Sequence, residues 1–193
     1  MNSDCKPALL LIDIQKGLDD IEYYGGHRNN LQAEVNARKI LNFWRDHNFH
    51  VYHIKHNSTN PKSRLFKGLY GNEFKDIVKP LPHETIIEKQ VNSAFMGTDL
   101  KQQLDNLEIK NVIIAGLTTD HCVSSSARMA GNLGYDTFVV SDATATFDKV
   151  GSNGTKYSAE IIHEVELASL HNEFATIIET DDLLNIIKET YQI

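Results

Sequence analysis

A cysteine follows an apolar segment in the middle of the chain. Residues 111–115 (NVIIA) are short, continuously apolar and rich in β-branched side chains, which is typical of a strand buried on both faces. The segment 116–123 (GLTTDHCV) leads from this strand into a helix expected over residues 122–133. A thiol in the first helical turn lies near unpaired N–H groups that favour the thiolate. Cys122 is therefore a candidate nucleophile, although free cysteines also commonly just fill space in a core.

Two further reactive side chains follow other apolar segments. Asp13 comes directly after residues 7–12 (PALLLI), and Lys89 comes directly after residues 85–88 (TIIE). Because the carboxyl ends of parallel strands share one edge of a sheet, these side chains and the Cys122 thiol are expected to meet there. A buried aspartate needs a partner, which Lys89 or the thiol could supply. The alternative is a buried ion pair with no chemical role.

The elements that must position these residues alternate between strand and helix. Strands are expected at residues 7–12, 50–54, 85–88, 111–115, 135–140 and 175–178, and helices at 31–47, 99–107, 122–133, 158–170 and 181–191. This alternation predicts an α/β protein with a mostly parallel sheet wrapped by helices. Long polar stretches follow three strands, at residues 14–27, 55–84 and 141–157. Loops of that length are usually functional or disordered, and these leave the sheet edge at which open α/β sheets bind ligands.

Composition limits the class of protein. A chain of 193 residues fits a single domain over 1–193, and its 41% apolar and 23% charged residues are ordinary for a globular protein. The net charge of −7, with no basic cluster, argues against binding to nucleic acid or an anionic membrane. Cys5 and Cys122 are too few and too far apart for a disulfide framework or a zinc site. No leader pattern or membrane-length apolar segment is evident, so a cytoplasmic location is expected.

Three separate motifs resemble the isochorismatase-like superfamily of cysteine hydrolases, which includes nicotinamidases and other amidohydrolases. Residues 10–15 (LLIDIQ) resemble the family's first strand with its aspartate, and residues 87–95 (IEKQVNSAF) resemble its lysine strand. Residues 116–123, with small residues on the following helix, resemble its nucleophile turn. Together the motifs cover nearly the whole chain. The resemblance implies a three-layer α/β/α fold with a six-stranded parallel sheet in the order 3-2-1-4-5-6.

The resemblance also implies a site. Asp13, Lys89 and Cys122 would be the catalytic triad. A cis peptide bond at Leu117–Thr118 would turn the Thr118 N–H toward the same point as the Cys122 N–H, and two such donors form an oxyanion hole. The substrate-pocket candidates on the surrounding loops and turns are Gln15, His56, Phe95 and His121.

Nicotinamidases of this superfamily bind a metal through an aspartate and histidines after the second strand. The matching region here, residues 50–57 (HVYHIKHN), contains no aspartate, and nine histidines in the chain make an accidental cluster easy to obtain. At most one or two of His50, His53 and His56 could face the site. A metal-free site without a cofactor is expected, and metal binding by one of these histidines stays open.

These observations predict a hydrolase that cleaves the C–N bond of a small amide through a thioester on Cys122. Asp13 would accept the thiol proton, and Lys89 would keep Asp13 ionised. Two alternatives stay open: hydrolysis of a vinyl ether, as in true isochorismatases, in which the cysteine can be absent, and a non-catalytic thiol-based binding or redox-sensing protein. Superfamily members commonly form dimers or tetramers, so a homo-oligomer acting on a small molecule is expected.

Overall fold

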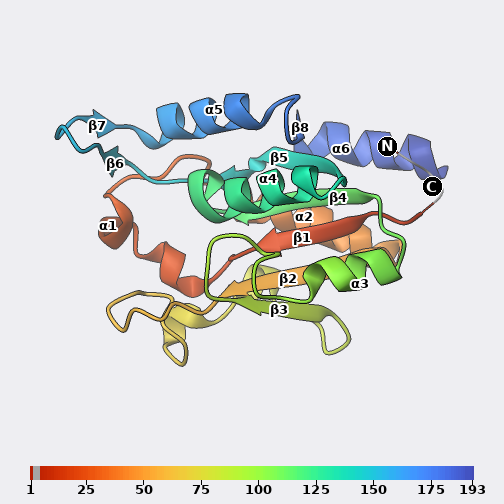
Figure 1. The fold of residues 1–193 in the computed structure, drawn as a ribbon, viewed down its shortest axis with the longest axis horizontal. Coiled ribbons are helices and arrows are strands. Elements are labelled where there is room, and N and C mark those ends of the chain that lie inside the picture. Colours follow the sequence, from red (N-terminus) through yellow and green to blue (C-terminus); the bar gives the residue numbers. More distant parts are fainter. Residues whose placement is uncertain (2–4) are drawn as a thin grey trace.

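Six parallel strands form one sheet across the molecule (Figure 1). The computed structural model describes residues 1 and 5–193. The strands are β1 (Ala8–Ile12), β2 (His50–His56), β3 (Thr85–Lys89), β4 (Asn111–Leu117), β5 (Asp136–Ala145) and β8 (Thr176–Ile178). Their order is β3-β2-β1-β4-β5-β8, and each neighbouring pair is parallel. This confirms the predicted sheet, in which β8 is the sixth strand.

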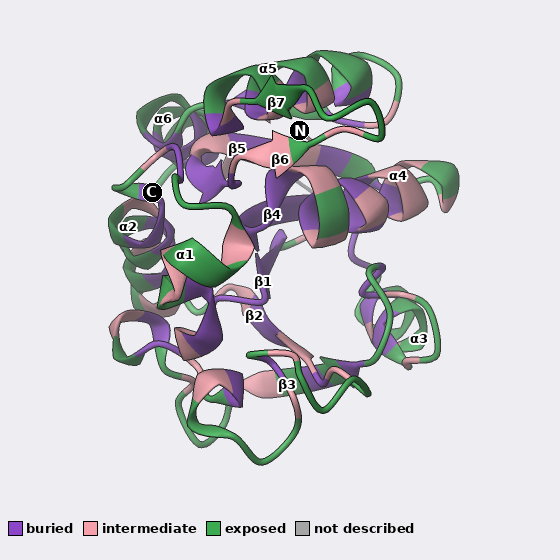
Figure 2. Ribbon diagram, turned by 90° about the vertical axis from the view of Figure 1, so that its left-hand side faces the viewer, coloured by how far each residue is buried: buried purple, intermediate pink, exposed green. Residues whose placement is uncertain are grey.

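Helices cover both faces of the sheet, as predicted (Figure 2). One face carries α2 (Ala33–Asp46) and α6 (Thr180–Tyr191), and the other carries α3 (Leu100–Asn106), α4 (Ser124–Asn132) and α5 (Ala159–Leu170). Successive side chains of β1 point to opposite faces of the sheet, so this strand contacts both helical layers. Leu9 and Leu11 pack toward α2, and Leu10 and Ile12 pack toward α3 and α4. Within residues 1 and 5–193, no helix is both long and apolar enough to cross a bilayer.

The spacing of apolar residues explains why β4 is a buried strand and α2 is a helix packed on the sheet. Every residue of β4 is buried, as expected for a strand covered on both faces. On α2, Ala37, Ile40, Leu41 and Trp44 follow helical spacing and are fully buried against the sheet. Burial of one such large side chain contributes about 1.5–3 kcal/mol relative to leaving it exposed.

The three long polar stretches hold more regular structure than the sequence indicates. The first contains a 3₁₀ helix (Lys16–Asp19) and α1 (Ile21–Tyr24), and the second contains 3₁₀ turns at Tyr70–Asn72 and Asp76–Val78. In the third, β5 continues to Ala145 and is followed by an antiparallel hairpin of β6 (Lys149–Val150) and β7 (Lys156–Tyr157). Apart from the extension of β5, these elements are only two to four residues long, so they leave no periodic pattern in the sequence.

A buried ion cluster links α2 to the end of the first of these stretches and to the second stretch. Arg28 donates two hydrogen bonds to Glu34, at 2.8 and 2.6 Å, and Lys75 reaches the same carboxylate at 2.5 Å. Lys75 also pairs with Asp19 at 2.6 Å. Hydrogen bonds and charges from Arg28 and Lys75 outweigh burial and lower the pKa of Glu34 to about 2. Glu34 on α2 is therefore held to Arg28 and Lys75 by charge pairs largely removed from water, whereas the Asp19 side chain, within residues 14–27, is 64% exposed.

Gly116 allows β4 to approach β1 closely beside the site. Its φ is +126°, and a Cβ at this position would lie 2.1 Å from the Ile12 carbonyl oxygen. Only glycine adopts this conformation without strain and avoids the clash. The absence of a side chain at Gly116 therefore lets β1 and β4 pair closely next to Asp13 and Cys122.

Candidate active site

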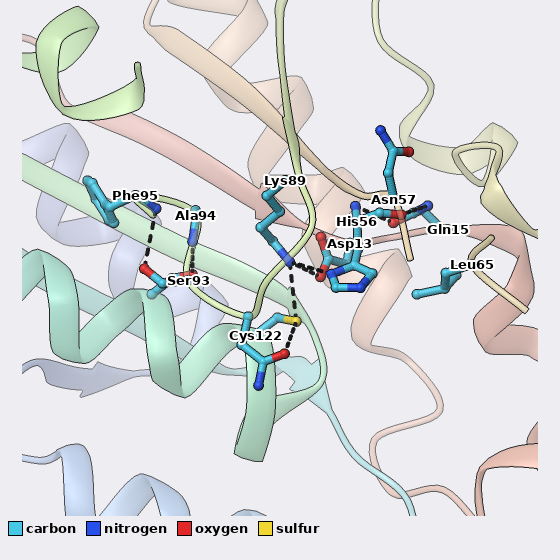
Figure 3. A network of polar contacts seen from close by, with 12 residues as sticks. Asp13, Gln15, His56, Asn57, Leu65, Lys89, Ser93, Ala94, Phe95 and Cys122 are labelled. Atoms are coloured by element: carbon cyan, nitrogen blue, oxygen red, sulfur yellow. Dashed lines mark hydrogen bonds and ion pairs between the residues drawn. The ribbon is translucent and has the colours of Figure 1, made fainter. Parts of the chain in front are cut away.

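Three strand ends bring Asp13, Lys89 and Cys122 together (Figure 3). Asp13 follows β1 with a positive φ of 49°, and its N–H donates to the Ile54 carbonyl of β2 at 3.0 Å. This left-handed conformation is rare for a non-glycine residue and turns the chain sharply out of the strand. Lys89 is the last residue of β3, and Cys122 lies in the π-helical turn Thr119–Val123 after β4.

The Lys89 side chain reaches across the end of β2. Because β2 separates β3 from β1 and neighbouring strands lie about 4.8 Å apart, a long side chain is needed to reach Asp13. The Lys89 ammonium lies 2.7 Å from Asp13 Oδ2, 3.2 Å from His56 Nδ1 and 3.3 Å from Cys122 Sγ. His56 is the register partner of Lys89 on β2. An ammonium has three N–H groups, and each has an acceptor here.

The Asp13 carboxylate is buried and uses only one of its oxygens. Oδ2 accepts from Lys89, whereas Oδ1 has no hydrogen-bond partner among the residues that the structure describes. Ligand atoms of Asp13, His56 and Cys122 all lie within 4.8 Å of one another. A buried carboxylate oxygen without a partner is costly to maintain, and here it lies where it could accept the thiol proton.

The surroundings of the Cys122 thiol favour its neutral, protonated form. Burial raises its pKa above the ordinary value, the Asp13 charge raises it further, and the Lys89 ammonium lowers it by less. The sequence-based expectation that a helix N-terminus favours the thiolate is therefore wrong for the resting enzyme. Cys122 lies in the π-helical turn before α4 and not in the first turn of α4 itself.

Backbone contacts shape the turn that carries the thiol. The Leu117–Thr118 peptide bond is cis, at the position that the resemblance implies. The Thr118 carbonyl accepts hydrogen bonds from the N–H groups of His121 at 3.1 Å and Val123 at 3.2 Å. These two bonds close the turn around Cys122.

Buried side chains hold the same turn from outside. Thr119 Oγ1 lies 2.8 Å from His163 Nδ1 on α5. Asp120 accepts from the Thr146 hydroxyl at 2.5 Å and pairs with Lys149 at 2.9 Å. Burial acts to raise the pKa of Asp120, but the Thr146 hydroxyl and the neighbouring bases outweigh it and lower that pKa. The turn is thus anchored both to α5 and to the chain after β5.

A pocket of about 220 Å³ opens over Asp13 and Cys122. Its volume is smaller than the roughly 300–1,000 Å³ that drug-sized ligands occupy. Tyr24 and Phe147 stack in its wall with ring centroids 5.0 Å apart. The pocket is lined by Asp13, Leu18, Tyr24, His56, Ser63, Leu65, Asn92, Leu117, Thr118, His121, Cys122, Phe147 and Lys149. It therefore suits a small molecule with an apolar part.

Comparison with known proteins identifies the group to which this site belongs. The family model for the isochorismatase domain matches residues 7–182. The chain belongs to the isochorismatase family. It is 48% identical over 186 residues to the isochorismatase family protein YrdC of Bacillus subtilis (strain 168), covering 96% of this chain and 98% of that protein.

More distant relatives and solved structures agree with this assignment. Nicotinamidase 3 of Arabidopsis thaliana is 27% identical over 191 residues, which cover 91% of this chain and 86% of that protein. The crystal structure of an isochorismatase-family hydrolase from Chromobacterium violaceum matches with a TM-score of 0.91 at 38% identity, covering 95% of this chain and 94% of that one. The chain is thus an isochorismatase-family hydrolase.

Two of the four predicted pocket residues of this isochorismatase-family chain line the pocket, namely His56 and His121. Phe95 does not: it stacks on Tyr135 with centroids 6.0 Å apart, packs against the hydrophobic core, and lines a separate surface depression beside α3. Figure 3 shows Phe95 apart from the Asp13–Lys89 pair. Its place in a family-like motif reflects packing and not contact with the pocket.

Gln15, the other predicted pocket residue, lies behind the pocket. Its side chain is fully buried, donates to the carbonyls of His56 at 3.1 Å and Asn72 at 2.9 Å, and accepts from the His56 N–H at 2.8 Å. Asn72 donates to the same His56 carbonyl at 2.9 Å. Gln15 therefore positions His56, against which the Lys89 ammonium rests.

Other pocket residues were missed in the sequence. Asn92 Oδ1 lies 3.8 Å from Cys122 Sγ, and Asn92 belongs to the same segment from which Phe95 was chosen. Leu18 and Tyr24 come from the first long polar stretch, and Phe147 and Lys149 come from the third. The length of these stretches indicated a functional role, but no local signal distinguished the residues that face inward.

The histidines of β2 do not form a metal site with Asp13 and Cys122. His53 is fully buried and pairs with Glu84 at 2.8 Å, and His50 lines a separate depression. His56, Asp13 and Cys122 are close enough to share an ion, but the Lys89 ammonium already donates to an atom of each. A second cation at this point would meet the Lys89 charge directly, so the donor set does not suit a metal.

Proposed function

We propose that this hydrolase cleaves the C–N bond of a small amide through a thioester on Cys122. One observation carries the proposal: a thiol, a partly unpaired carboxylate and an ammonium meet under a pocket that fits a small molecule. Each group has a role in acyl transfer, as nucleophile, proton acceptor and counter-charge respectively.

The first step begins from the neutral thiol. Cys122 Sγ attacks the carbonyl carbon while its proton passes to Asp13, whose Oδ1 has no partner among the described residues. Lys89 stays hydrogen-bonded to Asp13 Oδ2 and to Sγ. Its positive charge therefore stabilises negative charge on both atoms while the proton moves and the C–S bond forms. Proton transfer by a positioned carboxylate contributes typically about 100- to 10,000-fold in rate.

The developing oxyanion needs donors on the other side of the carbonyl. The backbone N–H groups of Thr118 and Cys122 are the proposed oxyanion hole. Thr118 lines the pocket, and its carbonyl is held by two hydrogen bonds within the turn, which supports a fixed direction for the neighbouring N–H groups. Removal of one such donor typically costs about 100- to 1,000-fold in rate.

Collapse of the tetrahedral intermediate breaks the C–N bond. The protonated Asp13 gives its proton to the departing nitrogen, which leaves as ammonia or an amine. Asp13 then accepts a proton from water as that water attacks the thioester, and the acid leaves as Sγ regains a proton. The cycle restores the neutral thiol and the Asp13–Lys89 pair and consumes one water for each amide.

Two features favour amide over vinyl ether hydrolysis. Cys122 lines the pocket beside Asp13, which suits covalent catalysis, and one relative is named a nicotinamidase, an amide-cleaving activity. The expected homo-oligomer, a dimer or a tetramer, stays a prediction. Vinyl ether hydrolysis and thiol-based sensing are outcomes that the following experiment distinguishes.

The test measures ammonia released from a panel of small primary amides. The wild-type protein should release ammonia, Cys122→Ala should not, and both should keep the same circular dichroism spectrum. Acid quenching during turnover should trap an acyl adduct on the peptide that contains Cys122, detected by mass spectrometry. Full activity of Cys122→Ala would show that the thiol is not the nucleophile, and ether cleavage without ammonia release would favour the vinyl ether reaction.

A further inference from the structure

His56 lines the catalytic pocket and has no step in the chemistry proposed above. Its ring nitrogen Nδ1 lies 3.2 Å from the Lys89 ammonium. An ammonium only donates hydrogen bonds, so Nδ1 must present its lone pair to it, and the proton of the neutral ring then lies on Nε2. The contact therefore requires one form of the imidazole, the neutral tautomer that is protonated on Nε2.

The Lys89 ammonium depends on this acceptor. Its side chain is 0% exposed, and its three N–H groups face Asp13 Oδ2, His56 Nδ1 and Cys122 Sγ. A thiol sulfur is a weak acceptor, so the carboxylate and the imidazole mainly decide where the ammonium lies. Loss of the Nδ1 lone pair would leave a buried, charged N–H group without a partner, which is costly.

The backbone of His56 is held from behind the ring. The side chains of Gln15 and Asn72 both donate to its carbonyl, and Gln15 also accepts from its N–H. Figure 3 shows Gln15 at the backbone of His56 while the ring points toward Lys89. The imidazole is therefore presented to the ammonium by buried residues that make no contact of their own with it.

Protonation of the ring would turn this contact into a repulsion. Nδ1 would then carry a proton and part of a positive charge at 3.2 Å from the Lys89 ammonium. Burial and the Lys89 charge lower the pKa of His56, whereas Asp13 and a hydrogen bond with the Val91 backbone act to raise it. Among the described residues, the other titratable groups that line the pocket are Tyr24, His121, Cys122 and Lys149. Because the bound ammonium disfavours the protonated ring, protonation must weaken the hold on the ammonium by the same free energy.

We propose that His56 is a positioning residue: its neutral imidazole holds the Lys89 ammonium between Asp13 and Cys122, and protonation of the ring releases the ammonium. After release, Lys89 no longer stabilises negative charge on the sulfur, and attack by Cys122 becomes slower. The inference rests on the proposed function for its effect on turnover. Its effect on the thiol can be measured without any substrate.

A double-mutant cycle on thiol alkylation tests the positioning role. His56→Leu and His56→Asn have nearly the same shape, but only the asparagine keeps an acceptor near the position of Nδ1. Because Lys89 lowers the thiol pKa, iodoacetamide labelling of Cys122 at pH 8 should be at least about threefold slower in His56→Leu and within about twofold of the wild type in His56→Asn. His83→Leu, on an exposed histidine outside the pocket, should leave the rate unchanged. In a Lys89→Met background, His56→Leu should change the rate by less than about twofold, because its effect passes through the ammonium.

Two outcomes of the cycle would overturn the inference. An unchanged rate in His56→Leu would show that Lys89 is held without His56. A loss of the same size in the Lys89→Met background would show that the ring acts on the thiol directly. Circular dichroism checks the fold of each variant, and if Lys89→Met does not fold, the comparison of His56→Asn with His56→Leu decides.

NMR of ring-labelled histidine tests the release on protonation. The His56 signal is assigned by its absence from His56→Asn, its pKa should lie below 6.5, and Lys89→Met should raise that pKa. For any amide that is hydrolysed, the ratio of kcat in His56→Asn to kcat in the wild type should rise as the pH is lowered from about 7.5 to about 5. An unchanged His56 pKa in Lys89→Met, or a constant ratio, would contradict the release. A protein that hydrolyses no amide would instead contradict the proposed function, and the alkylation and NMR results would still decide this inference.

Discussion

Lys89 donates a hydrogen bond to the Cys122 sulfur at 3.3 Å, although Lys89 ends an edge strand and Cys122 follows a central one. The same ammonium bonds Asp13 at 2.7 Å, so one cation contacts both the acid and the nucleophile. Burial and Asp13 raise the pKa of the thiol, while Lys89 opposes them. The protonation state of Cys122 is thus a balance between groups that can be removed one at a time.

Alkylation of Cys122 should be slow at neutral pH. A raised thiol pKa means that the reactive thiolate is scarcer than in a free cysteine, whose pKa is about 8.5, so the iodoacetamide rate should keep rising above that pH. Mass spectrometry of the two cysteine peptides separates Cys122 from Cys5. A rate that levels off below pH 8 would contradict the neutral thiol.

Asp13→Asn should change hydrolysis and alkylation in opposite directions. Loss of the proton acceptor should lower kcat by at least about 100-fold. Loss of the negative charge should lower the thiol pKa, because Lys89 remains beside the sulfur, and alkylation at pH 8 should become faster. Asp99→Asn, on an exposed residue, is the control. A fall in both rates would point to a general structural defect.

Gln15→Leu should weaken both stability and catalysis. The substitution leaves the His56 N–H and the Asn72 carbonyl without their amide partner, each at about 1–3 kcal/mol, while the His56 carbonyl keeps its bond from Asn72. Urea unfolding measures the loss of stability, and kcat for any accepted amide should fall because His56 supports Lys89. Gln102→Leu, on an exposed amide of α3, should change neither value. An unchanged Gln15→Leu protein would show that His56 is positioned by other contacts.

Glu34 should contribute stability that depends on pH. Its pKa is lowered from 4.5 to about 2, so the folded state gains from its ionisation above pH 4.5 and loses this gain as the pH falls toward 2. The gain is about 3 kcal/mol. Glu34→Gln should therefore unfold more easily than the wild type at pH 7, and the difference should shrink in urea titrations near pH 3. A difference that does not change with pH would indicate a role through packing alone.

The sequence predicts both the sheet and the meeting of Asp13, Lys89 and Cys122, because the apolar strands that form the sheet also carry these residues at their ends. Apolar runs such as residues 111–115 define buried strands, and parallel strands bring Asp13, Lys89 and Cys122 to one edge. The order of the strands, however, came from the resemblance, since local patterns do not specify which strands are neighbours.

The pocket could not be predicted to the same extent. Gln15 and Phe95 stand in motif positions beside the triad, but their side chains point into packed surroundings, and side-chain direction depends on tertiary contacts. Lys149 lies in a hairpin only four strand residues in size, which has no periodicity to detect. The raised pKa of the Cys122 thiol could not be predicted either, because the burial of Cys122 depends on segments distant in the chain.

The position of β3 at the border of the sheet has a consequence for heat resistance. This strand is hydrogen-bonded in the sheet to β2 alone, yet it delivers the ammonium on which the other two reacting groups rely. Edge segments fray before central ones open. Moderate warming should therefore abolish activity while most backbone amide protons are still protected from exchange. The loss should be reversible, because β3 returns the Lys89 ammonium to the site when it pairs with β2 again.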